Sequence, residues 1–188
     1  DIVTNLGYVR PIDRNMISWM KPGSVVPLMW EAWEFRPEDI NLSACRTQGV
    51  KVLGTNEHDP RVRTWQYVGL TVAKLLLENG IEICGCNILL LGKGKFVDAS
   101  ASCLRKNGAN MINGADAFDD AENVDAVVCL EHNDYRKTLI GRGGQIDEKT
   151  TMPENTFILH ICGRISQEFI AEKGWRLVPS EVAEPGRM

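Results

Sequence analysis

Two glycines follow a short apolar run near the middle of the chain, where the sequence reads NILLLGKGKFV. In the dinucleotide-binding fingerprint GxGxxG, the first glycine makes a tight turn and the second lets the backbone approach a pyrophosphate. Gly92 and Gly94 fill these two places, between an expected strand and an expected helix. The third glycine allows close helix packing, and Val97 replaces it. We therefore expect the amides that face a phosphate to be retained and the helix packing to be relaxed.

Side chains around these glycines complete a candidate cofactor site. Lys93 and Lys95 would favour a phosphate, although loop lysines are ordinarily solvated, and Phe96 starts the following helix. A ribose is usually held by an acidic residue at the end of the second strand, about 20 residues further on. Asn113 and Asp116 are the candidates there. Strand-glycine-helix turns also occur without a ligand, so the loop alone leaves both interpretations open.

Polar residues also follow two later apolar runs. Glu131 and His132 come after AVVCL, and Cys162 comes after FILHI. Because ligands of open parallel sheets lie beyond the carboxyl ends of the strands, we expect these residues near a bound cofactor. His132 is a candidate proton donor, since imidazole titrates near neutral pH, and an ordinary loop histidine is the alternative. His160, inside its apolar run, is expected to be structural.

The elements that must position these residues alternate along the chain. Near-continuous apolar runs such as ILLL and AVVCL are typical of strands covered on both faces, and the alternation predicts an α/β fold with a doubly wound parallel sheet. Asn-Gly pairs at residues 79–80 and 107–108 are expected to end helices. The expected strands span residues 2–6, 25–29, 50–54, 87–91, 110–113, 126–130, 156–161 and 176–179, and the expected helices residues 12–20, 42–47, 60–79, 96–107, 145–150 and 166–173.

The long helix over residues 60–79 is the expected domain boundary. Asp59 is a good N-cap and Pro60 suits the first helical turn. Residues 1–58 then form part of one α/β domain, and residues 59–188, with the crossover helix, form a Rossmann-like domain. The 188 residues amount to about one and a half domains, and the chain starts at Asp1 and stops at Met188 without a capping element. We therefore expect a piece of a longer protein.

Composition excludes several classes of function. The chain has 21 basic and 25 acidic residues and no basic cluster, which argues against nucleic acid as a partner. No apolar run reaches the roughly 18 to 20 residues of a membrane helix. The six cysteines lie mostly in apolar runs, and the close pair Cys84 and Cys86 lacks a second pair at zinc-site spacing. We expect a cytoplasmic protein without a bound metal.

The segment INLSACRTQGVKVLGTN, followed by the expected long helix and then ILLLGKGKF, resembles the D-2-hydroxyacid dehydrogenase superfamily. In that family a segment of the type ID…A…GI.V.NT ends a flavodoxin-like substrate domain, and a long helix leads into a Rossmann domain. Looser matches are VDAVVCLEHNDYRKTLIGRG, MPENTFILHICGR and VAEPGRM, so the resemblance extends over about residues 40–185. It implies hydride transfer between NAD or NADP and a 2-hydroxy or 2-oxo acid. We also expect a homodimer.

The resemblance also implies roles for individual residues. Arg164, one position out of the family's register, corresponds to the arginine that binds the substrate carboxylate, and its planar fork suits that group. Glu184 in AEP corresponds to the glutamate that orients a histidine. The family's histidine would lie beyond Met188, which leaves His132 as the alternative proton donor. A small anionic molecule is the expected substrate.

One segment departs from the family, and two other functions stay open. The family's glycine-rich substrate loop is replaced by LMWEAWEFRPEDIN, whose large or charged residues form either a substrate wall or a surface turn with packed tryptophans. These residues are Trp30, Glu31, Trp33, Glu34 and Arg36. The alternatives are a nucleotide-binding module without dehydrogenase chemistry and a Rossmann protein that binds S-adenosylmethionine or S-adenosylhomocysteine.

Overall fold

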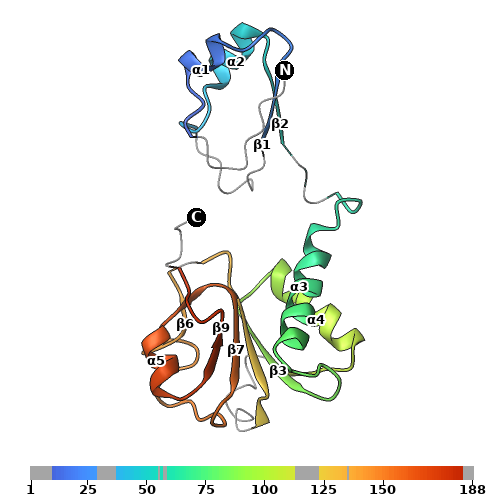
Figure 1. Cartoon of the computed structure of the whole chain (residues 1–188), viewed down its shortest axis with the longest axis vertical. Helices are drawn as coiled ribbons and strands as arrows, with labels where there is room; N and C mark the ends of the chain where they lie inside the picture. Colours follow the sequence, from blue (N-terminus) through green and yellow to red (C-terminus); the bar gives the residue numbers. More distant parts are fainter. Residues whose placement is uncertain are drawn as a thin grey trace. The chain divides into compact units, whose positions relative to one another are not determined.

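The chain forms two compact units, Asp1–Val62 and Arg63–Met188, in a computed structural model. The structure describes residues 10–28, 37–54, 56, 59–112, 123–134 and 136–183. Figure 1 shows the elements of each unit, coloured along the chain. None of the described helices is long and apolar enough to cross a membrane.

The first unit is a small α/β assembly. Its elements are α1 (Arg14–Ser18), β1 (Val25–Leu28), α2 (Leu42–Gln48) and β2 (Lys51–Gly54), and the two strands pair in parallel. Asn41 caps α2 by accepting a hydrogen bond from the amide of Ala44 at 2.9 Å. The core gathers Ile12, Ile17, Val26, Ile40 and Cys45. The expected strand over residues 2–6 lies outside the described residues.

A five-stranded parallel sheet forms the centre of the second unit, as the fold class predicted. The strands are β3 (Asn87–Leu91), β4 (Asn110–Ile112), β5 (Ala126–Leu130), β7 (Phe157–Cys162) and β9 (Arg176–Val178). They lie in the order β4-β3-β5-β7-β9. The order reverses between β3 and β5, because β4 lies on one side of β3 and the later strands lie on the other. In open α/β sheets such a switch point is where ligands bind.

Both faces of this sheet are covered, which explains the continuous apolar runs. Ile88 and Leu90 pack under α3 (Thr64–Glu78) and α4 (Lys95–Lys106). Leu89 and Leu91 face the other side, where α5 (Gln167–Glu172) and residues 138–152 pack. Alternate side chains of each strand therefore enter two different cores. Gly80 and Gly108, with φ of 80° and 86°, follow α3 and α4 as the Asn-Gly pairs predicted.

The long helix begins four residues later than expected. Asp59 does not cap it, because its carboxylate accepts a hydrogen bond from the amide of Arg61 at 2.9 Å and forms an ion pair with that guanidinium at 2.6 Å. Pro60 and Arg61 therefore lie in a turn. The helix starts at Thr64, after Arg63 with a left-handed φ of 57°.

The expected helix over residues 145–150 is wrong. Instead β6 (Thr138–Ile140) pairs in parallel with β8 (Arg164–Ile165), and Ile146 bridges to Ile140. The glycines before this segment make the turn: the amide of Gly141 donates to the carbonyl of Ile146 at 2.9 Å, and Ile146 donates back to Leu139 at 2.9 Å. Burial of Ile146 in the core holds the segment extended.

Candidate functional site

A glycine turn, residues 92–94, joins β3 to α4 at the switch point. Gly92 has a φ of 119°, and a Cβ there would lie 2.7 Å from the amide nitrogen of Glu131, so a side chain does not fit. Gly94 has a φ of 81° and is the N-cap residue of α4, where no side chain bonds to the helix amides. Free amides at a helix N-terminus, together with the helix dipole, favour an anion. Val97, in the third place of the fingerprint, leaves this turn intact.

The loop after β5 closes over the first turn of α4. The ring of His132 stacks on Phe96 with centroids 4.1 Å apart and planes 14° apart, and Trp65 of α3 contacts Phe96 at 5.8 Å. The ammonium of Lys95 lies 4.8 Å from the Trp65 ring centroid. The Nδ1 atom of His132 is buried without a hydrogen-bond partner among the described residues. The histidine therefore packs beside the glycine turn as part of an aromatic stack.

Glu131 shapes the loop that carries this histidine. Its side chain is buried, and Oε1 accepts hydrogen bonds from the amides of Asn133 at 3.0 Å and Asp134 at 3.2 Å. Gly163, at the end of β7, approaches from the other side, since a Cβ there would lie 3.2 Å from the Cβ of Glu131. The ends of β3, β5 and β7 thus meet at Glu131.

Burial changes the pKa values of two side chains of β7, Cys162 and His160. Cys162 lies opposite Leu130 in the sheet register, and burial raises the pKa of its thiol to about 12, with a smaller contribution from Glu131. The thiol is therefore protonated at neutral pH and is a poor nucleophile. Burial lowers the pKa of His160, and its Nε2 lies 2.7 Å from the Gly163 carbonyl. A neutral imidazole that donates this hydrogen bond supports the chain just before Arg164.

One cavity of about 490 Å³ lies beside the end of β4. Gly92 and Val97 line it together with Met111 and Ile112 of β4. Gln145 also lines it, and its Oε1 is buried without a hydrogen-bond partner among the described residues. An unsatisfied buried acceptor is costly, but this oxygen has almost no accessible surface, so the cavity contacts the rest of the Gln145 side chain. The cavity itself adjoins the glycine turn through Gly92.

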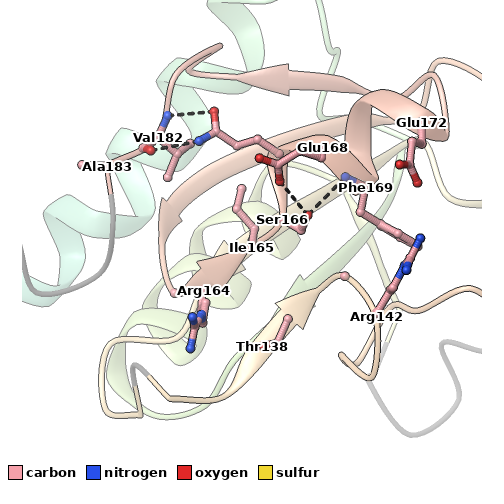
Figure 2. Close-up of a pocket in the computed structure, with 13 residues that line it drawn as sticks. Thr138, Arg142, Arg164, Ile165, Ser166, Glu168, Phe169, Glu172, Val182 and Ala183 are labelled. Carbon is pink, nitrogen blue, oxygen red and sulfur yellow. Dashed lines mark hydrogen bonds between the residues drawn. The ribbon is translucent and has the colours of Figure 1, made fainter.

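A second cavity, of about 480 Å³, contains Arg164 (Figure 2). We call it the arginine cavity, because Arg142 lines it too. Ser166 holds one wall, with Oγ accepting from the amide of Phe169 at 3.2 Å. Gln167 holds another, since its side-chain amide exchanges two hydrogen bonds with the backbone of Val182, at 3.0 and 3.2 Å. Gly163 also lines this cavity. Because Gly163 lies against Glu131, the cavity adjoins the strand ends.

The structure brings most of the predicted site residues together. The glycine turn, Phe96, Glu131 and His132 gather at the ends of β3 and β5, with Cys162 beside them in the register, and Arg164 lines the arginine cavity. Asn113, Asp116 and Glu184 lie outside the described residues, as do residues 30–36 of the altered substrate loop.

Three further residues were missed by the sequence reasoning. Trp65 lies in the first turn of a helix and has no local sign of its contact with Phe96. Arg142 and Gln145 belong to the segment GRGGQ, whose last residue, Gln145, begins the helix that the sequence predicts over residues 145–150. The glycines of that segment were the available signal for a turn rather than a helix. Among the described residues, no three His, Cys, Asp or Glu side chains gather where they could hold a metal ion.

The fold of this chain is similar to that of several solved structures. No family model and no curated protein matches the sequence. One solved structure, of a dipicolinate synthase chain from Bacillus halodurans, matches with a TM-score of 0.54 and 14% identity over 93% of this chain and 63% of that one. The dipicolinate synthase chain from Bacillus subtilis matches with a TM-score of 0.55 and 11% identity, over 88% and 59% of the two chains.

A third solved structure belongs to the family that the sequence resembles. It is a putative D-isomer specific 2-hydroxyacid dehydrogenase, NAD-binding, from Polaromonas sp. JS6 66, with a TM-score of 0.51 and 15% identity over 99% of this chain and 70% of that one. The predicted resemblance is thus confirmed at the level of a shared Rossmann-like fold. The chain spans about three fifths of the length of the two dipicolinate synthase chains.

Proposed function

We propose that this chain is part of an NAD- or NADP-dependent oxidoreductase that acts on a small anionic 2-oxo or 2-hydroxy acid. The glycine turn is the observation that carries the proposal. It combines a position where only glycine fits with an uncapped helix N-terminus at the switch point of a parallel sheet. In this proposal residues 59–188 bind the cofactor, and residues 1–58 belong to the substrate domain.

The residues of the site have distinct roles in this proposal. The amides of the glycine turn bind the pyrophosphate, and the cavity beside β4 accepts the adenosine half. The nicotinamide supplies or accepts the hydride when the cofactor is bound. Arg164 binds the substrate carboxylate. His132 is the proposed proton donor, because the other described histidine, His160, is engaged with Gly163.

Two measurements test this function. Oxidation of NADH or NADPH is followed by absorbance with a panel of 2-oxo acids, and turnover is expected with at least one of them. Thermal-shift assays compare NADH, NADPH, S-adenosylmethionine and S-adenosylhomocysteine. Stabilisation by a nicotinamide cofactor supports the proposal. If none of the four compounds stabilises the protein, nucleotide binding at the glycine turn is ruled out.

A non-catalytic nucleotide-binding module is the second candidate. The observation that favours it is the stack of His132 on Phe96 with a buried Nδ1, which leaves at most the other ring nitrogen for proton transfer. Stabilisation by NADH without turnover of any 2-oxo acid would support this candidate. Stabilisation by S-adenosylmethionine or S-adenosylhomocysteine, without stabilisation by NADH, would instead support the third candidate, a Rossmann protein that binds one of these two compounds.

We also propose a cytoplasmic homodimer that forms through α3. In the second unit, the large apolar side chains that the described residues leave exposed are Tyr67, Leu70 and Leu77, all on this helix. Their spacing places them on one stripe, together with Lys74 and Glu78. In an antiparallel pair of these helices, Leu70 of one copy would lie opposite Leu77 of the other. A symmetric dimer needs such a self-complementary surface.

A further inference from the structure

The arginine cavity holds two cationic side chains rather than the single one that a 2-oxo monocarboxylate needs. Arg164 belongs to β8, and its register partner is Thr138 of β6. Arg142 follows β6, and in the view of Figure 2 the two arginines lie on either side of Thr138. Neither guanidinium forms an ion pair, a cation-π contact or a hydrogen bond with the described residues. Both are therefore available to a ligand.

The two carboxylates that line the cavity do not neutralise these arginines. Glu168 accepts a hydrogen bond from the Ser166 hydroxyl at 3.0 Å. A hydrogen bond to its own amide, followed by the bond from Ser166, lowers the pKa of this carboxyl, so it stays ionised and turned to its own helix. Glu172, one turn further along α5, forms no ion pair with either arginine. An anionic ligand would not have to displace a carboxylate from either guanidinium.

We infer that the arginine cavity binds a small dianionic acid, and that Arg142 holds the second anionic group. The inference rests on the proposed function, in which Arg164 holds the first carboxylate. A guanidinium presents paired donors that match a carboxylate in a bidentate pair, and the two guanidinium groups on either side of Thr138 provide one such fork for each end of a dianion. The volume of about 480 Å³ suits a small molecule.

The position of the cavity sets the orientation of the dianion. Gly163 lines the cavity and lies against Glu131, whose backbone in turn lies against Gly92 of the glycine turn. Arg164 follows Gly163 directly, so its backbone adjoins the strand ends, whereas Arg142 follows β6. The carboxylate beside the reacting carbon binds Arg164, and the distal carboxylate binds Arg142. The hydrogen bonds of Ser166 and Gln167 hold the walls in place before the ligand arrives.

Substitution of Arg142 tests the inference. The probes are the dicarboxylates oxaloacetate and 2-oxoglutarate and the monocarboxylates pyruvate and 2-oxobutyrate, each with NADH. The wild-type protein is expected to prefer a dicarboxylate. R142Q should raise the KM for that dicarboxylate by on the order of tenfold to a hundredfold, the loss of one charge-assisted pair, and leave the KM for monocarboxylates unchanged. R142K should recover part of the loss, because it restores the charge without the fork.

E172Q is the matched control, since it removes a charge of opposite sign from the same cavity. It should leave the KM for the dicarboxylate unchanged or lower it. Unchanged melting temperatures of both variants show that folding is intact. The inference is overturned if the wild-type protein prefers monocarboxylates, or if R142Q raises the KM equally for both classes of acid. In either case, turnover with NADH would still support the proposed function.

Direct binding separates this inference from the proposed function. If no nicotinamide cofactor binds and no substrate turns over, the proposed function fails, and succinate and propionate are compared by thermal shift instead. Succinate that stabilises the wild-type protein but not R142Q supports the dianion site. Equal stabilisation by both acids, or by neither, overturns it.

Discussion

At the scale of single residues, the glycine turn is determined by space as well as by backbone conformation. Gly92 and Gly143 both have a left-handed φ, of 119° and 70°. A Cβ on Gly92 would meet the backbone of β5, whereas a Cβ on Gly143 would meet no atom within 4 Å. The two positions therefore separate backbone strain from steric exclusion.

Gly92→Ala is expected to cost more than Gly143→Ala. Both substitutions carry the strain of alanine at positive φ, about 1 to 2 kcal/mol. Gly92→Ala also displaces the strand ends, which adds roughly 1 to 3 kcal/mol and weakens NADH binding on the order of tenfold or more. Urea denaturation and fluorescence titration with NADH measure the two effects. Equal losses in both variants would contradict the close packing of Gly92 on Glu131.

Cys162 should react slowly with alkylating agents in the folded protein. Burial raises its pKa from the ordinary 9.0 to about 12, so the thiolate is scarce at mildly alkaline pH, whereas the thiol of Cys84 is exposed. Peptide mapping after brief treatment with iodoacetamide should show Cys84 modified well before Cys162. In urea the two cysteines should react at similar rates. Rapid modification of Cys162 in the folded state would contradict its burial.

The same shift predicts the pH dependence of stability. A thiol with a raised pKa in the folded state binds its proton more tightly there than in the unfolded state. Its contribution to stability is complete below the unfolded value of 9.0 and is lost as pH rises towards about 12. Cys162→Ser should flatten this alkaline part of the stability curve, which is measured by urea denaturation across that range.

At the scale of elements, α3 and α4 pack closely because α3 has a glycine at the contact. A Cβ on Gly69 would lie 2.6 Å from the carbonyl oxygen of Ala99 and 2.8 Å from the Cβ of Cys103. The fingerprint's third glycine brings a helix close to its strand, but here the close approach is between two helices. A glycine inside a helix carries a conformational cost, which this packing offsets.

Gly69→Ala should therefore destabilise the protein although alanine favours helices. The expected loss is about 1 to 3 kcal/mol, because the alanine methyl forces the helices apart. Thr71→Ala, on the exposed side of the same helix, should change stability by less than about 0.5 kcal/mol. Thermal and urea denaturation compare the two variants. A stabilising Gly69→Ala substitution would contradict the contact with Ala99.

All five strands of the central sheet could be predicted, and the two strands of the small β6–β8 sheet could not. Asn87–Leu91 and Ala126–Leu130 match the predicted ranges because both their faces are buried. The two-residue and three-residue strands β8 and β6 are too short for any periodic pattern. Similarly, Asp59 has the residue type of a helix cap, but its contact with Arg61 was not visible in the pattern.

At the scale of the whole molecule, the stripe on α3 predicts the assembly. Leu70→Glu and Leu77→Glu should each shift the protein from dimer to monomer, because a charge replaces an apolar contact at the two-fold axis. Trp19→Glu, which changes a still more exposed apolar residue in the first unit, should leave the dimer intact. Analytical ultracentrifugation over a range of protein concentrations measures the change. A wild-type monomer at all concentrations would contradict the proposed dimer.

The sequence by itself determined the five strands of the central sheet in their order along the chain and the place of the glycine turn. Both follow from local rules: apolar runs need burial on two faces, and positive φ favours glycine. Only the tertiary structure decided that Glu131 joins three strand ends, that His132 stacks on Phe96 and that Arg142 shares a cavity with Arg164. These contacts join residues of different elements. The distances between such residues depend on strand order and register, so they cannot be predicted from the spacing of residues along the chain.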